Sequence, residues 1–285
     1  EYFDGNQYVN ITTDSPEQNT GGALGVYMGG SGTTDRIDEV QISTTGNSVD
    51  FGNITTSRNN NGDGGMASRV RGFFAQGQSP ITGRIEFITF ASRGDATVFG
   101  TMSNSITNGA ASASDDTRGL LHGGYAAPTS VNVIQYITMA SSGNGVDFGD
   151  LSYGGTSSAF SSPTRAVNVD NGSNSMSYVT ISTLGNAADF GDSTFAGGHR
   201  AWGSNAIRGV AFGGELQPSG AKTNIIEFAT IATLGNATDF GDTISNIAEG
   251  STMTSGTRAV YCGGITPSSV NTMQYVQIMT AGNSI

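Results

Sequence analysis

The feature that most constrains the fold of this sequence is a motif that recurs six times along its 285 residues. Three copies read ISTTGNSVDFGN, ITMASSGNGVDFGD and IATLGNATDFGD. The turn glycine of the motif falls at Gly46, Gly94, Gly143, Gly185, Gly235 and Gly282, at intervals of 42 to 50 residues. Repeats of this length that read as short strands and turns are typical of propeller blades, so the chain is expected to be a repeat protein.

A second motif runs in register with the first. It begins with an arginine and ends on a glycine pair, as in RGLLHGG, RGVAFGG and RAVYCGG. The first copy, LGVYMGG, carries Leu24 in place of the arginine. The arginines of the other copies are Arg71, Arg118, Arg165, Arg208 and Arg258. Two motifs in step define one repeating unit.

Each unit is predicted to be a four-stranded meander. Small residues such as Ala111 to Ala113 suit an inner strand near an axis, and the arginine-to-glycine run forms the second strand. A run such as Ile226 to Ile231 is apolar on both faces, as expected for a third strand between neighbouring blades. The Gly-Asn pair suits a tight turn before an Asp-Phe-Gly-Asp outer strand. No segment shows a helical period, so residues 1–285 are predicted to form a single all-β, six-bladed propeller.

The ends of the sequence suggest how the ring closes. The last repeat stops at Gly282-Asn283-Ser284-Ile285, where the other repeats continue into Asp-Phe-Gly-Asp. The chain starts with Glu1-Tyr2-Phe3-Asp4, which has an acid and an aromatic residue in the same order. We therefore expect residues 1–5 to complete the last blade as its outer strand, which leaves no unpaired sheet edge.

The repeat resembles the kelch repeat. A glycine pair ends one strand, an aromatic residue lies in the next, and a bulky aromatic follows; kelch blades usually have Trp at this last position. Here it is Phe51, Phe99, Phe148, Phe190 and Phe240, with Tyr2 in the closing blade. The particular segments GNATDFGD and TRAVYCGG are more narrowly similar to repeats of virion and tail-fibre proteins of marine bacteriophages. That resemblance implies a virion-surface or extracellular location.

Charge and composition exclude several classes of partner and of covalent link. The net charge is −11 with a single lysine, Lys222, so a phosphate backbone would be repelled and nucleic acid is not an expected partner. No apolar run approaches the length of a membrane span, so membrane insertion is not expected. Cys262 is the only cysteine, which excludes a disulfide within the chain. The sequence begins without Met, as expected for a processed product or an excised piece.

Two repeated polar features have two interpretations each. The arginines either form a ring for an anionic ligand or tie each blade to its neighbour, and repetition in nearly every blade favours the ties. Acid pairs recur as Asp147/Asp150, Asp189/Asp192, Asp239/Asp242 and Glu1/Asp4. They either share Ca²⁺ or accept hydrogen bonds from turn amides. Calcium requires about six to eight oxygen ligands, so the second interpretation is favoured and no metal site is predicted.

The sequence does not favour catalysis. His122 stands where other repeats have apolar residues, so it is interpreted as a core substitution, and Cys262 as a small buried residue. His199 has no recurrent carboxylate, nearby cysteine or second histidine. No metal cluster or catalytic triad is predicted by spacing, and no cofactor is expected.

The loops of the two faces differ. Turns of one face are short and alike, whereas loops of the other, such as GYAAPTSVN and GELQPSGAKTN, are long and unlike one another. Irregular loops on a rigid scaffold suit ligand recognition. The alternative is that these loops vary in sequence only because loops tolerate substitution. Trp202 occupies an inner-strand position that holds small residues elsewhere. We predict either that it binds sugar rings together with His199, Arg200, Tyr153 and Tyr125, or that it plugs the channel.

Three functions follow from this sequence. The leading hypothesis is a non-enzymatic virion-surface or tail-fibre domain that binds a host-cell receptor, with a glycan as the expected ligand. The second is a virion scaffold whose flat face docks other virion proteins. The third is a propeller enzyme that acts on polysaccharide.

Overall fold

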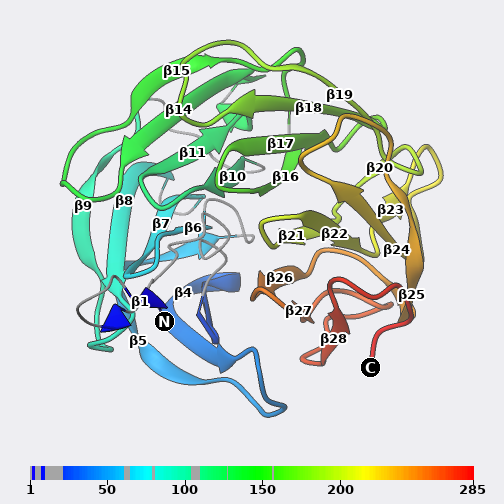
Figure 1. Cartoon of the computed structure of the whole chain (residues 1–285), viewed down its shortest axis with the longest axis horizontal. Coiled ribbons are helices and arrows are strands. Elements are labelled where there is room, and N and C mark those ends of the chain that lie inside the picture. Colours follow the sequence, from blue (N-terminus) through cyan, green and yellow to red (C-terminus); the bar gives the residue numbers. More distant parts are fainter. Residues whose placement is uncertain are drawn as a thin grey trace.

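The computed structural model describes residues 2–3, 8–9, 22–60, 65–78, 81–103, 110–126, 128–155 and 157–285. All regular elements in these ranges are strands. They form antiparallel sheets that radiate as six blades around a central axis (Figure 1). The structure therefore confirms the predicted all-β, six-bladed propeller, an arrangement consistent with a kelch-like repeat.

Blades 2 to 5 each contain four strands in the predicted meander order. Blade 2 comprises β6 (Gly65–Ala67), β7 (Arg71–Gln78), β8 (Ile81–Thr89) and β9 (Thr97–Thr101). Blade 3 comprises β10 (Ala111–Ser114), β11 (Arg118–His122), β14 (Val133–Thr138) and β15 (Val146–Asp150). Blade 4 comprises β16 (Ser157–Ser161), β17 (Arg165–Asp170), β18 (Ser175–Thr180) and β19 (Ala188–Asp192). Blade 5 comprises β21 (Ala201–Ser204), β22 (Arg208–Phe212), β24 (Ala221–Thr230) and β25 (Thr238–Ile247).

The two blades at the seam of the ring have three described strands each. Blade 1 comprises β3 (Leu24–Met28), β4 (Gly30–Gln41) and β5 (Val49–Asn60), which match the second, third and outer strands of other blades. Blade 6 comprises β26 (Ser251–Thr254), β27 (Arg258–Cys262) and β28 (Met273–Gln277). Short strand pairs extend the irregular loops. β12 (Tyr125–Ala126) forms a hairpin with β13 (Thr129–Ser130), and β20 (Gly197–Gly198), before blade 5, pairs with β23 (Glu215–Leu216).

The hydrophobic core lies between adjacent blades. The five outer-strand phenylalanines are at most 4% exposed, because each packs against the next blade. Phe99 of blade 2, for example, shares one cluster with Leu121 and Ile137 of blade 3. The third strands are apolar on both faces for the same reason, as the sequence predicted.

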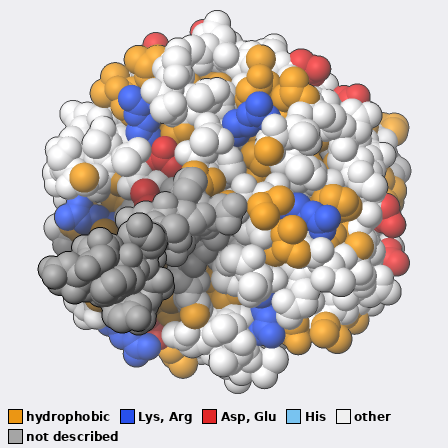
Figure 2. Space-filling view, viewed as in Figure 1, with side chains coloured by type: hydrophobic (Ala, Val, Ile, Leu, Met, Phe, Trp, Pro, Cys, Tyr) orange, Lys and Arg blue, Asp and Glu red, His pale blue; other side chains and the backbone are white. Residues whose placement is uncertain are grey.

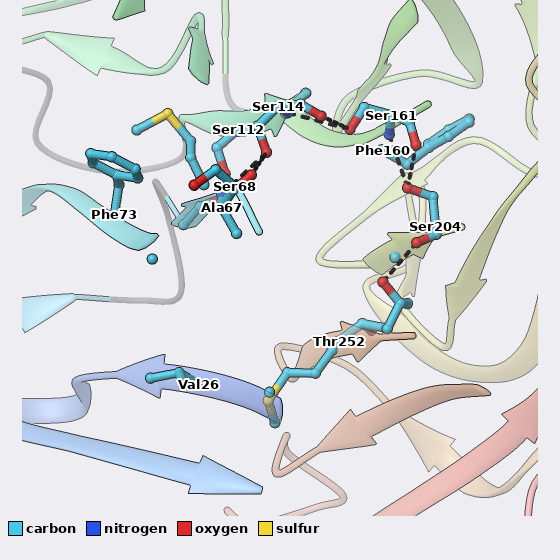
Figure 3. A pocket seen from close by; sticks show the side chains of 18 of the residues that line it. Val26, Ala67, Ser68, Phe73, Ser112, Ser114, Phe160, Ser161, Ser204 and Thr252 are labelled. Atoms are coloured by element: carbon cyan, nitrogen blue, oxygen red, sulfur yellow. Dashed lines mark hydrogen bonds between the residues drawn. The ribbon is translucent and has the colours of Figure 1, made fainter. Parts of the chain in front are cut away.

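Hydroxyl groups tie the inner strands together around the axis. Ser161 Oγ donates to the Ser114 carbonyl (2.9 Å), Ser204 Oγ to the Ser161 carbonyl (2.7 Å), and Thr254 Oγ1 to the Ser204 carbonyl (2.7 Å) (Figure 3). Thr252 Oγ1 likewise donates to the Ala201 carbonyl. Small hydroxyl residues therefore recur here because each satisfies a backbone carbonyl of the preceding blade where the strands converge.

The repeated arginines contact the neighbouring blade. Nη1 of Arg165 donates to the carbonyls of Ile231 (2.9 Å) and Ala232 (2.8 Å), and Nη1 of Arg118 to that of Ile181 (2.8 Å). Each guanidinium also lies 4.0 to 4.9 Å from an aromatic ring of its own blade. Arg71 and Arg258 donate to next-blade carbonyls in the same way, and Arg208 stacks on Phe228.

The ring closes differently from the sequence-based expectation. Tyr2–Phe3 form β1, which pairs with Tyr8–Val9 (β2) and not with β28. Figure 1 places β1 away from β28. Glu1 and Asp4 lie outside the described residues. The seam is instead held by packing of Val40 and Ile42 on Met253 and Val260, and by the bond from Arg258 Nη1 to the Ile42 carbonyl (3.0 Å).

We predict that Arg165→Leu destabilises the fold, because it removes two charge-assisted hydrogen bonds between blades 4 and 5. The expected loss is about 1.5–3 kcal/mol in the free energy of unfolding, measured by chemical denaturation. Arg69→Leu is the control, since its pair with Asp116 is largely exposed and is expected to contribute at most about 1 kcal/mol. Wild-type stability of Arg165→Leu would contradict the role of the arginines as ties.

Candidate functional site

The two faces of the disc are built differently. On the short-turn face, the repeated arginines and turns contact the next blade at successive junctions. Figure 2 shows Lys and Arg side chains spaced around the face toward the viewer, with hydrophobic side chains beside several of them. On the other face, loops between second and third strands meet the links between blades. The Gly124 amide donates to the Gly155 carbonyl (2.9 Å), for example, and β20 pairs with β23.

These irregular loops form a connected layer from blade 3 to blade 6. The Glu249 amide donates to the His199 carbonyl (3.1 Å), which joins the links on either side of blade 5. Ala248 forms a bridge with Ile265 in the loop of blade 6. Because the loops are tied to one another, side chains at their tips are held on a fixed framework. We call this layer the loop face; in the described part of the chain it comprises residues 123–126, 128–132, 151–155, 170–175, 193–200, 213–223, 244–250 and 263–272.

Trp202 lies inside the ring and not on the loop face. It is 7% exposed, stacks on Phe160 of blade 4 at 4.6 Å between ring centroids, and packs in the core between blades 4 and 5. No hydrogen-bond partner of its Nε1 lies among the described residues. This placement favours the alternative in which the indole fills space at the channel wall.

The cavity beside Trp202 is the central channel, with a volume of about 370 Å³. Its walls are inner strands and short turns, including Met66, Ser114, Phe160 and Ser204 (Figure 3). None of Tyr125, Tyr153, His199 and Arg200 lines it. The structure therefore does not bring Trp202 together with the other predicted sugar-binding residues in one pocket.

Arg200 is a buried structural residue. Its Nη1 pairs with Oε1 of Glu227 at 3.0 Å, with both side chains 1% exposed, and its Nη2 donates to the Gly197 carbonyl at 2.6 Å. Burial lowers the pKa of the guanidinium, and the Glu227 charge opposes that shift. Glu227 also accepts from the Thr194 amide (2.7 Å). With these partners, Arg200 fixes the link between blades 4 and 5 and offers little to a ligand.

Tyr153 is also turned inward. Burial, followed by the charge of Asp170, raises the pKa of its hydroxyl, which lies beside Ser177. Tyr125 and His199 differ, because they lie at the surface of the loop face. Tyr125 is 37% exposed and its hydroxyl donates to the Pro128 carbonyl (3.2 Å). The His199 side chain is 54% exposed, with Nε2 3.9 Å from a Glu215 oxygen.

The remaining nucleophile and base candidates, Cys262 and His122, are partly and fully buried, respectively. Cys262 has a pKa raised to about 12 by burial, so its thiol stays protonated near neutral pH. His122 is fully buried, contacts the Asn168 amide through Nδ1, and has a pKa lowered to about 4 by burial. Among the described residues, no group of three or more His, Cys, Asp and Glu side chains is placed to hold a metal ion.

The three acid pairs that the structure describes lie on outer strands whose backbone makes the contact with the next blade. The Asp150 amide donates to Asn186 Oδ1 and the Asp192 amide to Asn236 Oδ1, both at 3.0 Å. Sequence reasoning assigned acceptor roles to the aspartates and did not foresee this role for the turn asparagines. It also missed the Arg200–Glu227 pair. The signal available was the polar residue that recurs inside four of the apolar third strands, at Glu86, Gln135, Glu227 and Gln274.

Comparisons with known proteins add no family. No model of a known protein family matches the chain, and no curated protein matches its sequence. In the part of the chain that the structure describes, no helix has the length and apolar character to cross a membrane.

We predict that Trp202→Ala lowers the free energy of unfolding by about 3–5 kcal/mol, because it leaves a cavity against Phe160. Trp202→Phe should lose less, since a second ring still stacks there. Chemical denaturation measures both losses. A Trp202→Ala protein as stable as wild type would show that the indole is not a packing residue and would restore it as a ligand contact.

His122 should make stability depend on pH. The unfolded pKa of about 6.5 exceeds the folded value of about 4, so the unfolded state binds the proton first and stability falls as pH drops below 6.5. This residue alone should remove about 2 kcal/mol between pH 7 and pH 5. His122→Val should flatten the profile by that amount. Parallel profiles for wild type and His122→Val would refute the assignment.

Proposed function

We propose that this propeller is a non-enzymatic recognition domain that binds its ligand on the loop face. The observation that carries the proposal is that the two faces of the disc are built from different kinds of residues. Repeated positions are used for contacts between blades, whereas the loop face is irregular in sequence and tied into a fixed layer. A rigid scaffold with one variable face is the usual arrangement of a recognition module.

A host-cell surface glycan is the proposed ligand. Tyr125 and His199 are exposed on the loop face and offer a ring face and hydrogen-bonding atoms, which suit sugar rings and hydroxyls. The net charge of −11 disfavours polyanionic ligands. The resemblance of the repeat to bacteriophage virion and tail-fibre repeats supports a place on the virion surface, with other virion proteins as neighbours.

A protein-docking scaffold is the second candidate, favoured by apolar side chains on the short-turn face. Leu184 is 53% exposed, Leu234 56% and Met279 44%, each in the turn that follows a third strand. Val70 and Ile207 are exposed in the adjacent turns between first and second strands. Such side chains on a flat face suit a protein partner better than a sugar.

Screening on a glycan array, followed by titration with the best ligand, tests the first proposal. Tyr125→Ala and His199→Ala should each weaken binding by more than about 1 kcal/mol without loss of fold. Leu184→Ala on the opposite face is the control and should bind as wild type does. Sugar release during titration would indicate an enzyme instead. Loss of binding only in Leu184→Ala would assign recognition to the short-turn face.

A further inference from the structure

The junction of blades 1 and 2 departs from the repeat at three positions. In the other blades, an arginine at the start of the second strand stacks on an aromatic ring of the third strand. By the register of β3 with β4, blade 1 has Leu24 at the arginine position and Glu39 at the aromatic position. In the turn of blade 2, Arg93 precedes the turn glycine, where blades 4 and 5 have leucine. These changes give this junction a chemical environment that the other junctions lack.

A small pocket lies at this junction, on the side of the short turns. Its lining includes Glu39, Gln41, Thr44, Asn47, Val49 and Arg93, and its volume is about 190 Å³. No aromatic ring or second-strand arginine of blade 1 occupies the space that this pair fills elsewhere. The volume is below the roughly 300–1,000 Å³ of pockets for drug-sized ligands, so the pocket suits a ligand of about one small ring.

Glu39 is the buried residue of this lining, and one of its carboxylate oxygens is unused. Its side chain is 2% exposed and pairs through Oε1 with Nη2 of Arg93. Its Oε2 is buried and has no hydrogen-bond partner among the described residues. A buried carboxylate oxygen without a donor costs stability, and a ligand that supplies the donor removes this cost. The Arg93 side chain is 60% exposed, so it forms the outer wall and is free to shift as a ligand enters.

The other lining groups identify the class of ligand. A cation would be repelled by Arg93 and an anion by Glu39, so the pair favours a neutral ligand. Hydroxyl groups suit both residues, because a hydroxyl donates to a carboxylate and accepts from a guanidinium. The uncharged polar side chains of the lining can also donate or accept, and Val49, 52% exposed, offers an apolar contact for C–H groups. A sugar ring combines hydroxyls and C–H groups in one small unit.

We propose that this pocket is a second binding site, which holds one neutral sugar unit. A sugar hydroxyl donates to Glu39 Oε2, a neighbouring hydroxyl accepts from Arg93, and C–H groups of the ring contact Val49. The same contacts serve a free monosaccharide and the end of a glycan chain. The pocket shares no residue with the loop face, so this proposal is independent of the ligand proposed there.

The probes are the methyl glycosides of glucose, galactose, mannose and N-acetylglucosamine, titrated into the full chain and followed by saturation-transfer NMR. We expect saturable binding of at least one probe. Leu24→Arg restores the arginine of the repeat, which should pair with the free Glu39 oxygen and fill the pocket. This variant should weaken binding by more than about tenfold, the effect of a hydrogen bond to a charged group. Its stability should be at least that of wild type, as measured by chemical denaturation.

Gln41→Ala tests the pocket without a change of charge and should weaken binding about two- to tenfold. Thr138→Ala is the matched control, because Thr138 pairs with Arg118 in blade 3 as Gln41 pairs with Leu24, and it should leave the affinity unchanged. A trisaccharide that ends in the bound unit distinguishes the two sources. Binding at least as tight as that of the methyl glycoside identifies a chain end, and exclusion of the trisaccharide identifies a free monosaccharide.

Absence of saturable binding by all four probes would overturn the proposal, as would wild-type affinity in both Leu24→Arg and Gln41→Ala. Loss of binding in Tyr125→Ala or His199→Ala, with wild-type affinity in Leu24→Arg, would place the sugar on the loop face. That result would reject this pocket and leave the proposed function standing. Conversely, binding that depends on Leu24 and Gln41 but not on Tyr125 or His199 would support this pocket whatever the outcome on the loop face.

Discussion

The fold depends on the contact between one blade and the next. A single blade has two apolar faces and cannot bury both alone, so stability comes from neighbours. Three sets of bonds hold each junction at different radii. Inner hydroxyls reach back to carbonyls near the axis, arginines reach forward beneath the short turns, and turn amides and asparagines hold the outer strand. Most of these bonds involve backbone groups, which explains why the loops of the opposite face can vary without loss of the ring.

The inner ring shows how a tryptophan fits among smaller residues. Hydroxyl residues suit the inner strands because several blades converge there and each carbonyl needs a donor. Trp202 departs from this pattern, and Phe160 of the preceding blade departs with it. The two rings stack, so the second substitution accommodates the first. A site that looks like a ligand platform in sequence is therefore explained by packing within the structure.

Much of the architecture was predictable because each strand and turn pattern, weak in a single blade, recurs in six blades. The blade number, the meander order and the buried outer-strand phenylalanines follow from register alone. The site was less predictable, because residue type does not determine exposure. Arg200 and Tyr153 stand in variable loops, yet Arg200 is buried and Tyr153 is partly buried. Closure was mispredicted because Glu1-Tyr2-Phe3-Asp4 matches an outer strand only by residue order. It also lacks a glycine after Tyr2, whereas a Cβ at this position of an outer strand, as at Gly149 or Gly241, would collide with a carbonyl in the turn of the next blade.

Blade 1 shows that the arginine tie acts as a unit with its aromatic partner. Other blades stack the arginine on an aromatic residue of the third strand, but blade 1 has Leu24 and, at the aromatic position, Glu39. Leu24 packs in the cluster that contains Phe90 of blade 2, so an apolar contact replaces the bond to a carbonyl. Glu39, only 2% exposed, pairs with Arg93 of blade 2, so the charged contact runs in the opposite direction. Because an uncompensated buried carboxylate would be costly, the two changes are linked: loss of the arginine frees the aromatic position, and a basic residue in the next turn makes an acid acceptable there.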